Sequence, residues 1–446
     1  MSWLLEKFKT FGNKTAIIWN NKEYSYKNLY DKIQEFETLL EKDIKKGEVI
    51  AILGDYSFEN IALFFYLYKN KNIIVPIISD KESEIKEKLK ESYSDKALKI
   101  NNGNIKIDTF PQTEKHNLIE NLRQSQNAGL ILFSSGSTGK PKAMLHNLDK
   151  MVDIYKNRKE KNINSLVFLT FDHIGGIDTL LRLLSIGGTI TIPDDRTPET
   201  VSKYIEKYKV EVLPTTPTFL NLLLISGVYH KYDLSSLKII AYGAEPMPEN
   251  LLKKLKEIFP NVEFQQKFGT SETNAIKVKN KKDNELFLKI EDENIQYKIV
   301  DGELWIKSKT QVLGYLNAPM DSFTKDGWFK TGDLVEKTKD GYIRIIGRKK
   351  EVINVGGEKV LPSEVEAVIL ELPSVLDCMV YGEENPITGQ MVVADVIIND
   401  DIDQKEAKKL IRKHCREKLD NYKVPTKINF VDKVNFGDRF KKIRRK

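Results

Sequence analysis

Hydrophobic and polar positions alternate along this chain in a way that predicts short strands and helices following one another. Two strands joined by a polar turn are expected within residues 14–26. Further strands are expected at 49–53, 73–78, 165–170, 189–192, 210–213 and 237–242, and helices at 29–40, 58–68, 178–184, 217–225 and 248–259. Residues 81–127 are polar and hold few strong signals. Strands that alternate with helices are typical of parallel sheets covered by helices.

The pattern changes toward the C-terminus. Residues 297–346 are rich in strand-like segments, so a β-rich part is expected there. After Gly347, a loop with paired glycines precedes a helix. We expect Ser363 to cap that helix, with Glu366 three residues later as in a capping box.

A chain of 446 residues is too long to fold around a single hydrophobic core of ordinary size, so two or three domains or sub-domains are expected. We predict a large N-terminal α/β domain at 1–346, with sub-domains built on parallel-rich sheets and a β-rich part. A hinge at 347–350 and a small, mobile α+β domain at 351–446 follow.

Composition and charge narrow the class of protein. The net charge of +7, from 71 basic and 64 acidic residues, mildly favours anionic ligands such as nucleotides and does not by itself indicate nucleic acid. The only cysteines, Cys378 and Cys415, form no CxxC pattern, which excludes a disulfide framework and a zinc site of the usual spacing. With neither a signal-peptide pattern nor an apolar run of membrane-spanning length, we expect a cytoplasmic protein, monomeric or homodimeric.

The segment SSGSTGKPKA at 134–143 follows a buried apolar run at 129–133. Glycines let a backbone approach a phosphate closely, hydroxyls donate hydrogen bonds, and Lys140 adds a mobile charge. A Walker loop differs, because it has four residues between its glycines and Ser or Thr after its lysine. Taken alone, the segment is equally compatible with a flexible surface turn. The candidate phosphate-binding residues are Ser134, Ser135, Gly136, Ser137, Thr138 and Gly139.

The whole pattern resembles the phosphate loop of the adenylate-forming superfamily, which includes acyl-CoA synthetases, luciferases and peptide-synthetase adenylation domains. Other stretches resemble motifs of that family, in the family's order. They are FDHIGG at 171–176, AYGAEPMP at 241–248, KFGTSET at 267–273 and DGWFKTGDLVEKTKDGYIRIIGRKKEVINVGGEKVLPSEVE at 326–366. The resemblance spans most of the chain and implies ATP, Mg²⁺ and CoA, or the phosphopantetheine of a carrier protein, as cofactors.

The resemblance implies that Lys140 helps to grip the β- and γ-phosphates of ATP and that His173 lines the acyl pocket. Taken alone, such a histidine is more often simply packed or exposed. Asp172 stands between Phe171 and His173, where the family usually has none. In amino-acid-activating relatives an Asp after Phe holds the substrate's ammonium group, so Asp172 leaves an amino-acid substrate open.

Two motifs resemble the family's adenine-binding region. Gly243, Ala244 and Glu245 belong to the segment that binds adenine, and the small residues would let a flat base lie against the backbone.

KFGTSET resembles the family's Tyr-Gly-x-Thr-Glu, with Gly269 matching, Phe268 in place of Tyr and Ser271 in place of Thr. Phe268 would stack on adenine. Ser271 would hydrogen-bond the α-phosphate. Glu272 would bind Mg²⁺, which needs few carboxylates besides phosphate oxygens.

The longest motif resembles the ribose-binding and hinge region. Asp333 would accept hydrogen bonds from the ribose hydroxyls, and Arg348 would donate to the same sugar. Lys350 would be the hinge residue. Gly356 and Gly357 would face the pantetheine arm of the thiol after the small domain rotates.

The chain ends in VNFGDRFKKIRRK, where the family has a segment like Pro-x-Thr-x-x-Gly-Lys-Ile-x-Arg. Aligning the Lys-Ile-x-Arg core puts Lys442 on the catalytic position, with Ile443 and Arg445 matching. The Pro and Thr are absent, and Lys441 replaces the glycine. Lys441 is an alternative candidate, and a solvated basic tail is the other interpretation.

The resemblance implies a two-step reaction in which a carboxylate attacks ATP to give acyl-AMP and pyrophosphate, and a thiol then displaces AMP. An acyl- or aryl-CoA ligase acting on a small carboxylic acid is the leading hypothesis. Loading of a carrier protein, possibly with an amino acid, is the alternative hypothesis. Asp172 and the basic segment KKLIRKHCREK favour it slightly, because carrier proteins are usually acidic. A nucleotide-binding relative that has lost catalysis is a third hypothesis, supported by the altered C-terminus.

Overall fold

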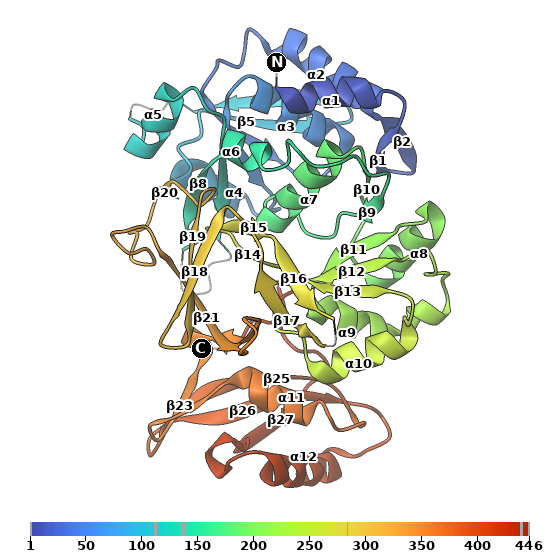
Figure 1. Ribbon diagram of the computed structural model, residues 1–446, viewed down its shortest axis with the longest axis vertical. Coiled ribbons are helices and arrows are strands. Elements are labelled where there is room, and N and C mark those ends of the chain that lie inside the picture. The colour runs from blue at the N-terminus through green and yellow to red at the C-terminus, as the bar shows by residue number, and fades with distance from the viewer. Residues whose placement is uncertain (1, 111–113, 135–139, 283, 438–439, 445–446) are drawn as a thin grey trace.

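The computed structural model describes residues 2–110, 114–134, 140–282, 284–437 and 440–444. Figure 1 shows helix-covered sheets in the upper and right-hand parts of the molecule, a β-rich layer at the centre left, and a smaller unit at the bottom. The smaller unit holds the elements that follow β22. The expected α/β fold, with a β-rich part and a small α+β unit, is confirmed.

One sheet is built largely from apolar strands and carries the segment that follows residue 133. Its order is β20-β8-β7-β4-β3-β5-β6, and parallel pairs join β5 to β3, β3 to β4 and β4 to β7. Strands β4 and β7 are buried along their whole length, as expected for parallel strands covered on both faces. The strands are β3 (Val49–Leu53), β4 (Ile73–Ile77), β5 (Lys96–Asn101), β6 (Asn104–Thr109), β7 (Gly129–Phe133), β8 (Ala143–Asn147) and β20 (Gly314–Tyr315).

The helices of this upper part supply much of its core. Helix α3 is buried nearly all round, whereas α2 buries one face. The helices are α1 (Trp3–Phe11), α2 (Tyr26–Leu40), α3 (Phe58–Lys69), α4 (Glu82–Glu91), α5 (Asn117–Gln124) and α6 (Leu148–Asp153).

The hairpin of β5 and β6 lies within residues 81–127, a polar stretch that holds few strong signals. Its turn is formed by Asn102 and Gly103, whose φ angles of 49° and 81° belong to the left-handed region. Asn-Gly is the favoured pair for such a two-residue turn, so the signal was present. The polar residues of both strands obscured it, because half of each strand faces outward.

A second sheet lies to the right in Figure 1 in the order β13-β12-β11-β9-β10-β1-β2, with only β2 antiparallel to its neighbour. The strands are β1 (Thr15–Trp19), β2 (Lys22–Ser25), β9 (Asn164–Leu166), β10 (Thr189–Thr191), β11 (Val212–Thr215), β12 (Ile239–Tyr242) and β13 (Glu263–Gln266). The helices are α7 (Ile174–Ser185), α8 (Pro198–Tyr208), α9 (Pro217–Ser226) and α10 (Glu249–Ile258).

The β-rich layer is an antiparallel sheet in the order β16-β17-β22-β21-β19-β18, next to a hairpin of β14 and β15. The strands are β14 (Phe268–Thr270), β15 (Asn274–Ile276), β16 (Val278–Lys281), β17 (Asn284–Ile290), β18 (Ile295–Val300), β19 (Glu303–Ser308), β21 (Phe329–Lys337) and β22 (Ile343–Arg348).

The smaller unit has its own apolar core beneath a sheet in the order β24-β23-β26-β25, with β27 also paired to β26. Its elements are β23 (Ile353–Val355), β24 (Glu358–Val360), α11 (Pro362–Ile369), β25 (Val375–Asn385), β26 (Gly389–Ile398), α12 (Gln404–Lys418) and β27 (Lys427–Phe430).

The expected cap of α11 was wrong. The helix begins at Pro362, so the N-cap is Leu361, and no side chain caps it. Proline suits the first helical position because its missing N–H would have had no partner there. The Ser363 hydroxyl instead donates to the carbonyl of Ile346 in β22, which ties the small unit to the β-rich layer.

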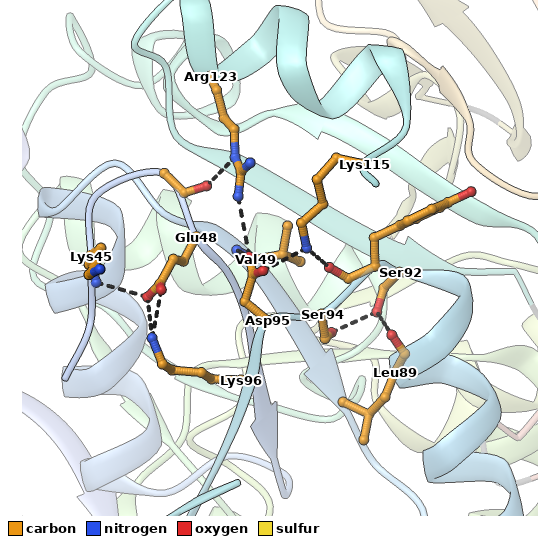
Figure 2. Close-up of polar contacts among 12 residues, drawn as sticks. Lys45, Glu48, Val49, Leu89, Ser92, Ser94, Asp95, Lys96, Lys115 and Arg123 are labelled. Atoms are coloured by element: carbon orange, nitrogen blue, oxygen red, sulfur yellow. Dashed lines mark hydrogen bonds and ion pairs between the residues drawn. The ribbon is translucent and has the colours of Figure 1, made fainter. Parts of the chain in front are cut away.

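Figure 2 shows a polar network around the amino ends of β3 and β5. Asp95 accepts from the backbone N–H of Val49 and pairs with Lys115 at 2.7 Å and Arg123 at 3.2 Å. The network joins these strands to α5. It lies at the opposite sheet edge from Ser134, which follows the carboxyl end of β7, so we assign it a structural role.

Among the described residues, no helix combines the length and the apolar character needed to cross a membrane.

Candidate active site

The candidate phosphate loop leaves the carboxyl end of β7 and returns into β8. Ser134 closes its base: its N–H donates to the Lys142 carbonyl at 3.0 Å, and its Oγ accepts from the Lys142 N–H at 2.9 Å. Ser135, Gly136, Ser137, Thr138 and Gly139 lie outside the described residues. The Lys140 ammonium group is largely exposed, 3.8 Å from a carboxylate oxygen of Glu87.

A pocket of about 620 Å³, including its open mouth, lies where the second sheet, the β-rich layer and the small unit meet. Its wall contains residues that are far apart in the sequence and were predicted to bind nucleotide. They are Ala244, Glu245, Phe268, Gly269, Asp333 and Arg348. Tertiary structure therefore brings these candidates together around one cavity.

One part of the pocket wall depends on close approach between backbone segments. A Cβ on Gly243 would lie 2.8 Å from the Lys267 carbonyl oxygen, and one on Gly269 would lie 2.5 Å from the Asn274 carbonyl oxygen. Ala244 has a φ of 70°, which turns the chain sharply after β12. Phe268 is buried, with 8% of its surface exposed, and it lines the pocket.

Asp333 and Arg348 face each other across β21 and β22. The Arg348 Nε lies 2.8 Å from Asp333 Oδ1, while Asp333 Oδ2 is buried and accepts no hydrogen bond from any described residue. Burial raises the pKa of Asp333, and the positive charges of Arg348 and Lys441 oppose that shift. A buried acceptor without a donor suits a ligand hydroxyl.

Glu272 lies in the turn between β14 and β15, next to Ser271. The Tyr315 hydroxyl donates to Glu272 Oε1 at 3.0 Å, and burial together with Glu272 raises the pKa of that tyrosine. Glu272 Oε2 has no hydrogen-bond donor within the described part of the chain. No cluster of three metal-ligating side chains occurs among the described residues. A single free carboxylate oxygen fits Mg²⁺ that also binds phosphate, since Mg²⁺ usually takes one or two carboxylates.

His173 is the N-cap of helix α7, which begins at Ile174. Its Nδ1 accepts from the Gly175 N–H at 3.0 Å, which satisfies one of the helix's first N–H groups. Asp172 is buried and accepts a hydrogen bond from the Thr170 hydroxyl at 2.7 Å. A capping role is thus established for His173 in the structure, and its role in an acyl pocket stays a prediction.

Lys442 points into the small unit. Its ammonium group lies 2.8 Å from Asp377 Oδ1 and 2.6 Å from the Cys378 carbonyl oxygen. Burial would lower the pKa of Lys442, but the carboxylates of Asp377 and Glu366 raise it above its ordinary range. The structure does not join this ammonium group to the pocket residues.

Three further residues predicted from the sequence, Lys350, Gly356 and Gly357, lie in the first segments of the small unit. Lys350 is exposed within the turn η2 (Lys349–Glu351) that follows β22. Gly356 and Gly357 form the tip of the β23–β24 hairpin with φ angles of 61° and 96°, outside the pocket wall.

Arg444 was not predicted, yet it lines the pocket and pairs with Glu351 and Glu366, each at 2.9 Å. It occupies the unspecified position of the Lys-Ile-x-Arg core, so the motif gave no reason to select it.

Comparisons with known proteins agree with this geometry. The AMP-binding enzyme family matches residues 4–316, and the AMP-binding enzyme C-terminal domain matches residues 364–436. The chain is 32% identical over 373 residues to acyl-CoA synthetase 7 of Caenorhabditis elegans, covering 76% of this chain and 69% of that protein.

Gramicidin S synthase 2 of Brevibacillus brevis is 24% identical over 472 residues, which cover 96% of this chain but 10% of that protein. The crystal structure of the anthranilate CoA ligase AuaEII in complex with anthranoyl-AMP has a TM-score of 0.84 at 20% identity. That comparison covers 99% of this chain and 95% of the other, and it shows a shared fold.

Proposed function

This chain belongs to the AMP-binding enzyme family of the adenylate-forming superfamily, and from that premise we propose that it is an acid–thiol ligase. It would activate a small carboxylic acid with ATP, release pyrophosphate, and transfer the acyl group to the thiol of CoA. The observation that carries the proposal is the unpaired, buried Oδ2 of Asp333 in the wall that Phe268 also lines.

The pocket supplies the groups that a nucleoside needs. The Phe268 ring would stack on the adenine, and the turn at Gly243 and Ala244 would lie against the flat base. Asp333 would accept hydrogen bonds from the ribose hydroxyls, with Arg348 as a further donor.

In the first step, a carboxylate oxygen of the substrate bonds to the α-phosphorus of ATP. The bond from that phosphorus to the oxygen bridging to the β-phosphorus breaks, and pyrophosphate leaves. Ser271 would donate to an α-phosphate oxygen, and Lys140 would neutralise charge on the departing pyrophosphate. Glu272 would hold Mg²⁺, which supplies positive charge to the phosphates. Positioning and charge neutralisation account for most catalysis of this kind.

In the second step, the thiol sulfur bonds to the acyl carbonyl carbon, the thiol loses its proton, and AMP leaves. We place the pivot at Lys350, in the exposed turn between β22 and β23. Rotation there would bring Gly356 and Gly357 to the acyl-adenylate, so that one site serves both steps.

A carrier-protein thiol is the second candidate acceptor. Helix α12 supports it, because exposed cations cover much of its surface and carrier proteins are usually acidic. These cations are Lys405, Lys409, Lys413, Arg416 and Lys418.

The deciding experiment is pyrophosphate release from ATP across a panel of aliphatic, aromatic, hydroxy and amino acids, without any thiol. We expect release with one class of acid, followed by AMP release when CoA is added. A pantetheinylated carrier protein replaces CoA in a parallel reaction. If no acid of the panel causes pyrophosphate release while ATP still binds, the result would contradict the proposal and favour a nucleotide-binding relative without catalysis.

A further inference from the structure

A partly buried ion pair between Asp55 and Arg196 joins the sheet that contains β3 to the second sheet. The Arg196 Nη2 lies 2.6 Å from Asp55 Oδ2, and the two side chains are 18% and 28% exposed, respectively. Asp55 follows β3, whereas Arg196 lies between β10 and α8. Because a guanidinium presents its donors in a rigid fork, such a pair fixes geometry as well as charge.

Both partners also hold the backbone of one segment, residues 168–171, which follows β9. Asp55 Oδ1 accepts a hydrogen bond from the Phe171 N–H at 3.0 Å. The Arg196 Nε donates to the Phe168 carbonyl oxygen at 2.5 Å. The ion pair and these two hydrogen bonds form a clamp, here called the Asp55–Arg196 clamp, that grips the segment at both ends.

The aromatic rings of the clamped segment belong to two different cores. The Phe171 ring centroid lies 4.6 Å from that of Tyr56 and 5.6 Å from that of Phe64, in the core of the upper part. The Phe168 ring centroid lies 4.5 Å from that of Phe219, in the core beside the second sheet. The segment therefore crosses from one core to the other exactly where the clamp holds it.

The clamped segment leads directly to His173. The His173 N–H donates to the Thr170 carbonyl at 3.1 Å. The first turn of α7 packs against the same carbonyl so closely that a Cβ on Gly176 would lie 2.2 Å from its oxygen. A displacement of Thr170 would therefore displace this turn and His173 with it. Asp55 and Arg196 thus act on the position of His173 through the backbone.

The clamp lies at the sheet edges that also carry the candidate site. Strands β3, β4 and β7 are parallel, so Asp55 after β3 lies at the same edge as Ser134 after β7. Strands β10, β9, β11 and β12 are parallel too, so Arg196 lies at the same edge as Ala244 of the pocket wall. Parallel sheets bind ligands at the carboxyl ends of their strands. The Asp95 network, by contrast, lies at the opposite edge.

We propose that Asp55 and Arg196 are positioning residues that set which carboxylic acids the site accepts. The inference rests on the proposed function, in which His173 lines the acyl side of the site. A displacement of about 1 Å in a site can change its activity about 100-fold. Because the clamp fixes the segment that ends at His173, loosening it should change acid selectivity more than nucleotide affinity.

The first test measures binding of two unreactive acyl-adenylate analogues, 5′-O-(N-acetylsulfamoyl)adenosine and 5′-O-(N-benzoylsulfamoyl)adenosine, and of AMP, by isothermal titration calorimetry. Asp55→Asn keeps an oxygen for the Phe171 N–H but loses the charge, and Arg196→Lys keeps the charge but loses the fork. We expect Asp55→Asn to change the Kd ratio of the two analogues at least about tenfold, and Arg196→Lys to change it less. The Kd of AMP should stay within about threefold of the parent value in both variants.

Glu48→Gln is the matched control. Glu48 likewise accepts a backbone N–H, that of Lys45 at 2.8 Å, and pairs with Lys96 at 2.6 Å, but it precedes β3 and so lies at the opposite edge (Figure 2). A loss of stability alone would affect both carboxylate variants alike and leave the ratio unchanged. We expect the ratio in Glu48→Gln to stay within about twofold of the parent value.

An unchanged ratio in folded Asp55→Asn and Arg196→Lys would overturn the inference, as would a parent protein that binds neither analogue more tightly than AMP. A changed ratio in a protein that releases no pyrophosphate with any acid would support the inference and contradict the ligase function.

Amide hydrogen exchange tests the clamp without any ligand. Peptides that cover residues 168–176 should exchange at least about tenfold faster in Asp55→Asn than in the parent, because the segment opens locally more often. The same peptides should be unaffected in Glu48→Gln. Equal exchange in Asp55→Asn and the parent would show that the pair does not hold the segment, and would overturn the inference.

Discussion

Arg348 lies directly opposite Asp333 in the pairing of β22 with β21, and its Nε is 2.8 Å from Asp333 Oδ1. The pairing uses one carboxylate oxygen and leaves Oδ2 buried without a donor among the described residues. The same carboxylate can therefore be held by the protein and still accept a hydrogen bond from a ligand.

The first prediction concerns this pair. Asp333→Ala should weaken ATP binding about 10- to 100-fold, because hydrogen bonds to a charged group are each worth about 1.5–3 kcal/mol. Isothermal titration calorimetry measures the Kd. The matched control is Lys349→Ala, which removes an ion pair with Glu303 next to the same strands but outside the pocket wall. ATP affinity that is equal in the two variants would rule out the ribose-binding role.

The second prediction concerns Glu272. Glu272→Gln keeps an acceptor for the Tyr315 hydroxyl but loses the negative charge, so pyrophosphate release should require a much higher Mg²⁺ concentration. Tyr315→Phe is the control, because it removes the hydrogen bond and keeps the carboxylate. Rates titrated against Mg²⁺ distinguish them. The magnesium assignment fails if the Mg²⁺ dependence of Glu272→Gln matches that of the parent.

The third prediction concerns His146 in β8, whose ring is fully buried. Burial lowers its pKa to about 3, from an ordinary value of 6.5. The unfolded chain therefore binds a proton between these values that the folded chain does not. Stability should be intact above about pH 6.5 and fall as the pH drops toward 3, by up to about 1.4 kcal/mol per pH unit from this group.

His146→Leu should remove that contribution. Neither ring nitrogen has a hydrogen-bond partner in the described part of the chain, so the apolar variant should be at least as stable as the parent at pH 8. Urea unfolding at pH 8 and pH 5 should show the parent losing about 2 kcal/mol more than the variant. Substitution of the exposed His230 by Asn is the control. Equal losses in parent and His146→Leu would contradict the burial effect.

The fourth prediction concerns the start of helix α7. A Cβ on Gly176 would lie 2.2 Å from the Thr170 carbonyl oxygen and 2.9 Å from the Tyr56 hydroxyl. Gly176→Ala should cost at least about 2 kcal/mol, because a backbone carbonyl cannot move aside as a side chain can.

Gly175→Ala is the matched control for that change. Its Cβ would meet the Cδ1 of Leu169 at 2.6 Å, the far end of a flexible side chain, and we expect a change within about 1 kcal/mol. Thermal unfolding measures both. Similar melting temperatures for the two variants would contradict the prediction, because they would mean that the backbone at Thr170 moves to accommodate the added methyl group.

Local sequence determined many of the elements. Apolar spacing placed the helix at 58–68 and the strand at 73–78, and the structure has Phe58–Lys69 and Ile73–Ile77. Such segments can be predicted because burial in the core requires apolar residues at the spacing of a helix or a strand, and this spacing is visible in the sequence. The strand expected at 165–170 ends at Leu166, since the chain leaves the sheet to form the turn before α7.

The motifs by themselves determined the family and the order of the candidate residues, and their chemistry pointed to a nucleotide. Only the tertiary structure decided which of them meet: Ala244, Phe268 and Asp333 line one pocket because separate sheets converge there. It also decided what the lysine selected by the tail motif contacts: the Lys442 ammonium group pairs with the buried Asp377 of the small unit. These two residues lie 65 positions apart, so the sequence around Lys442 does not specify the contact.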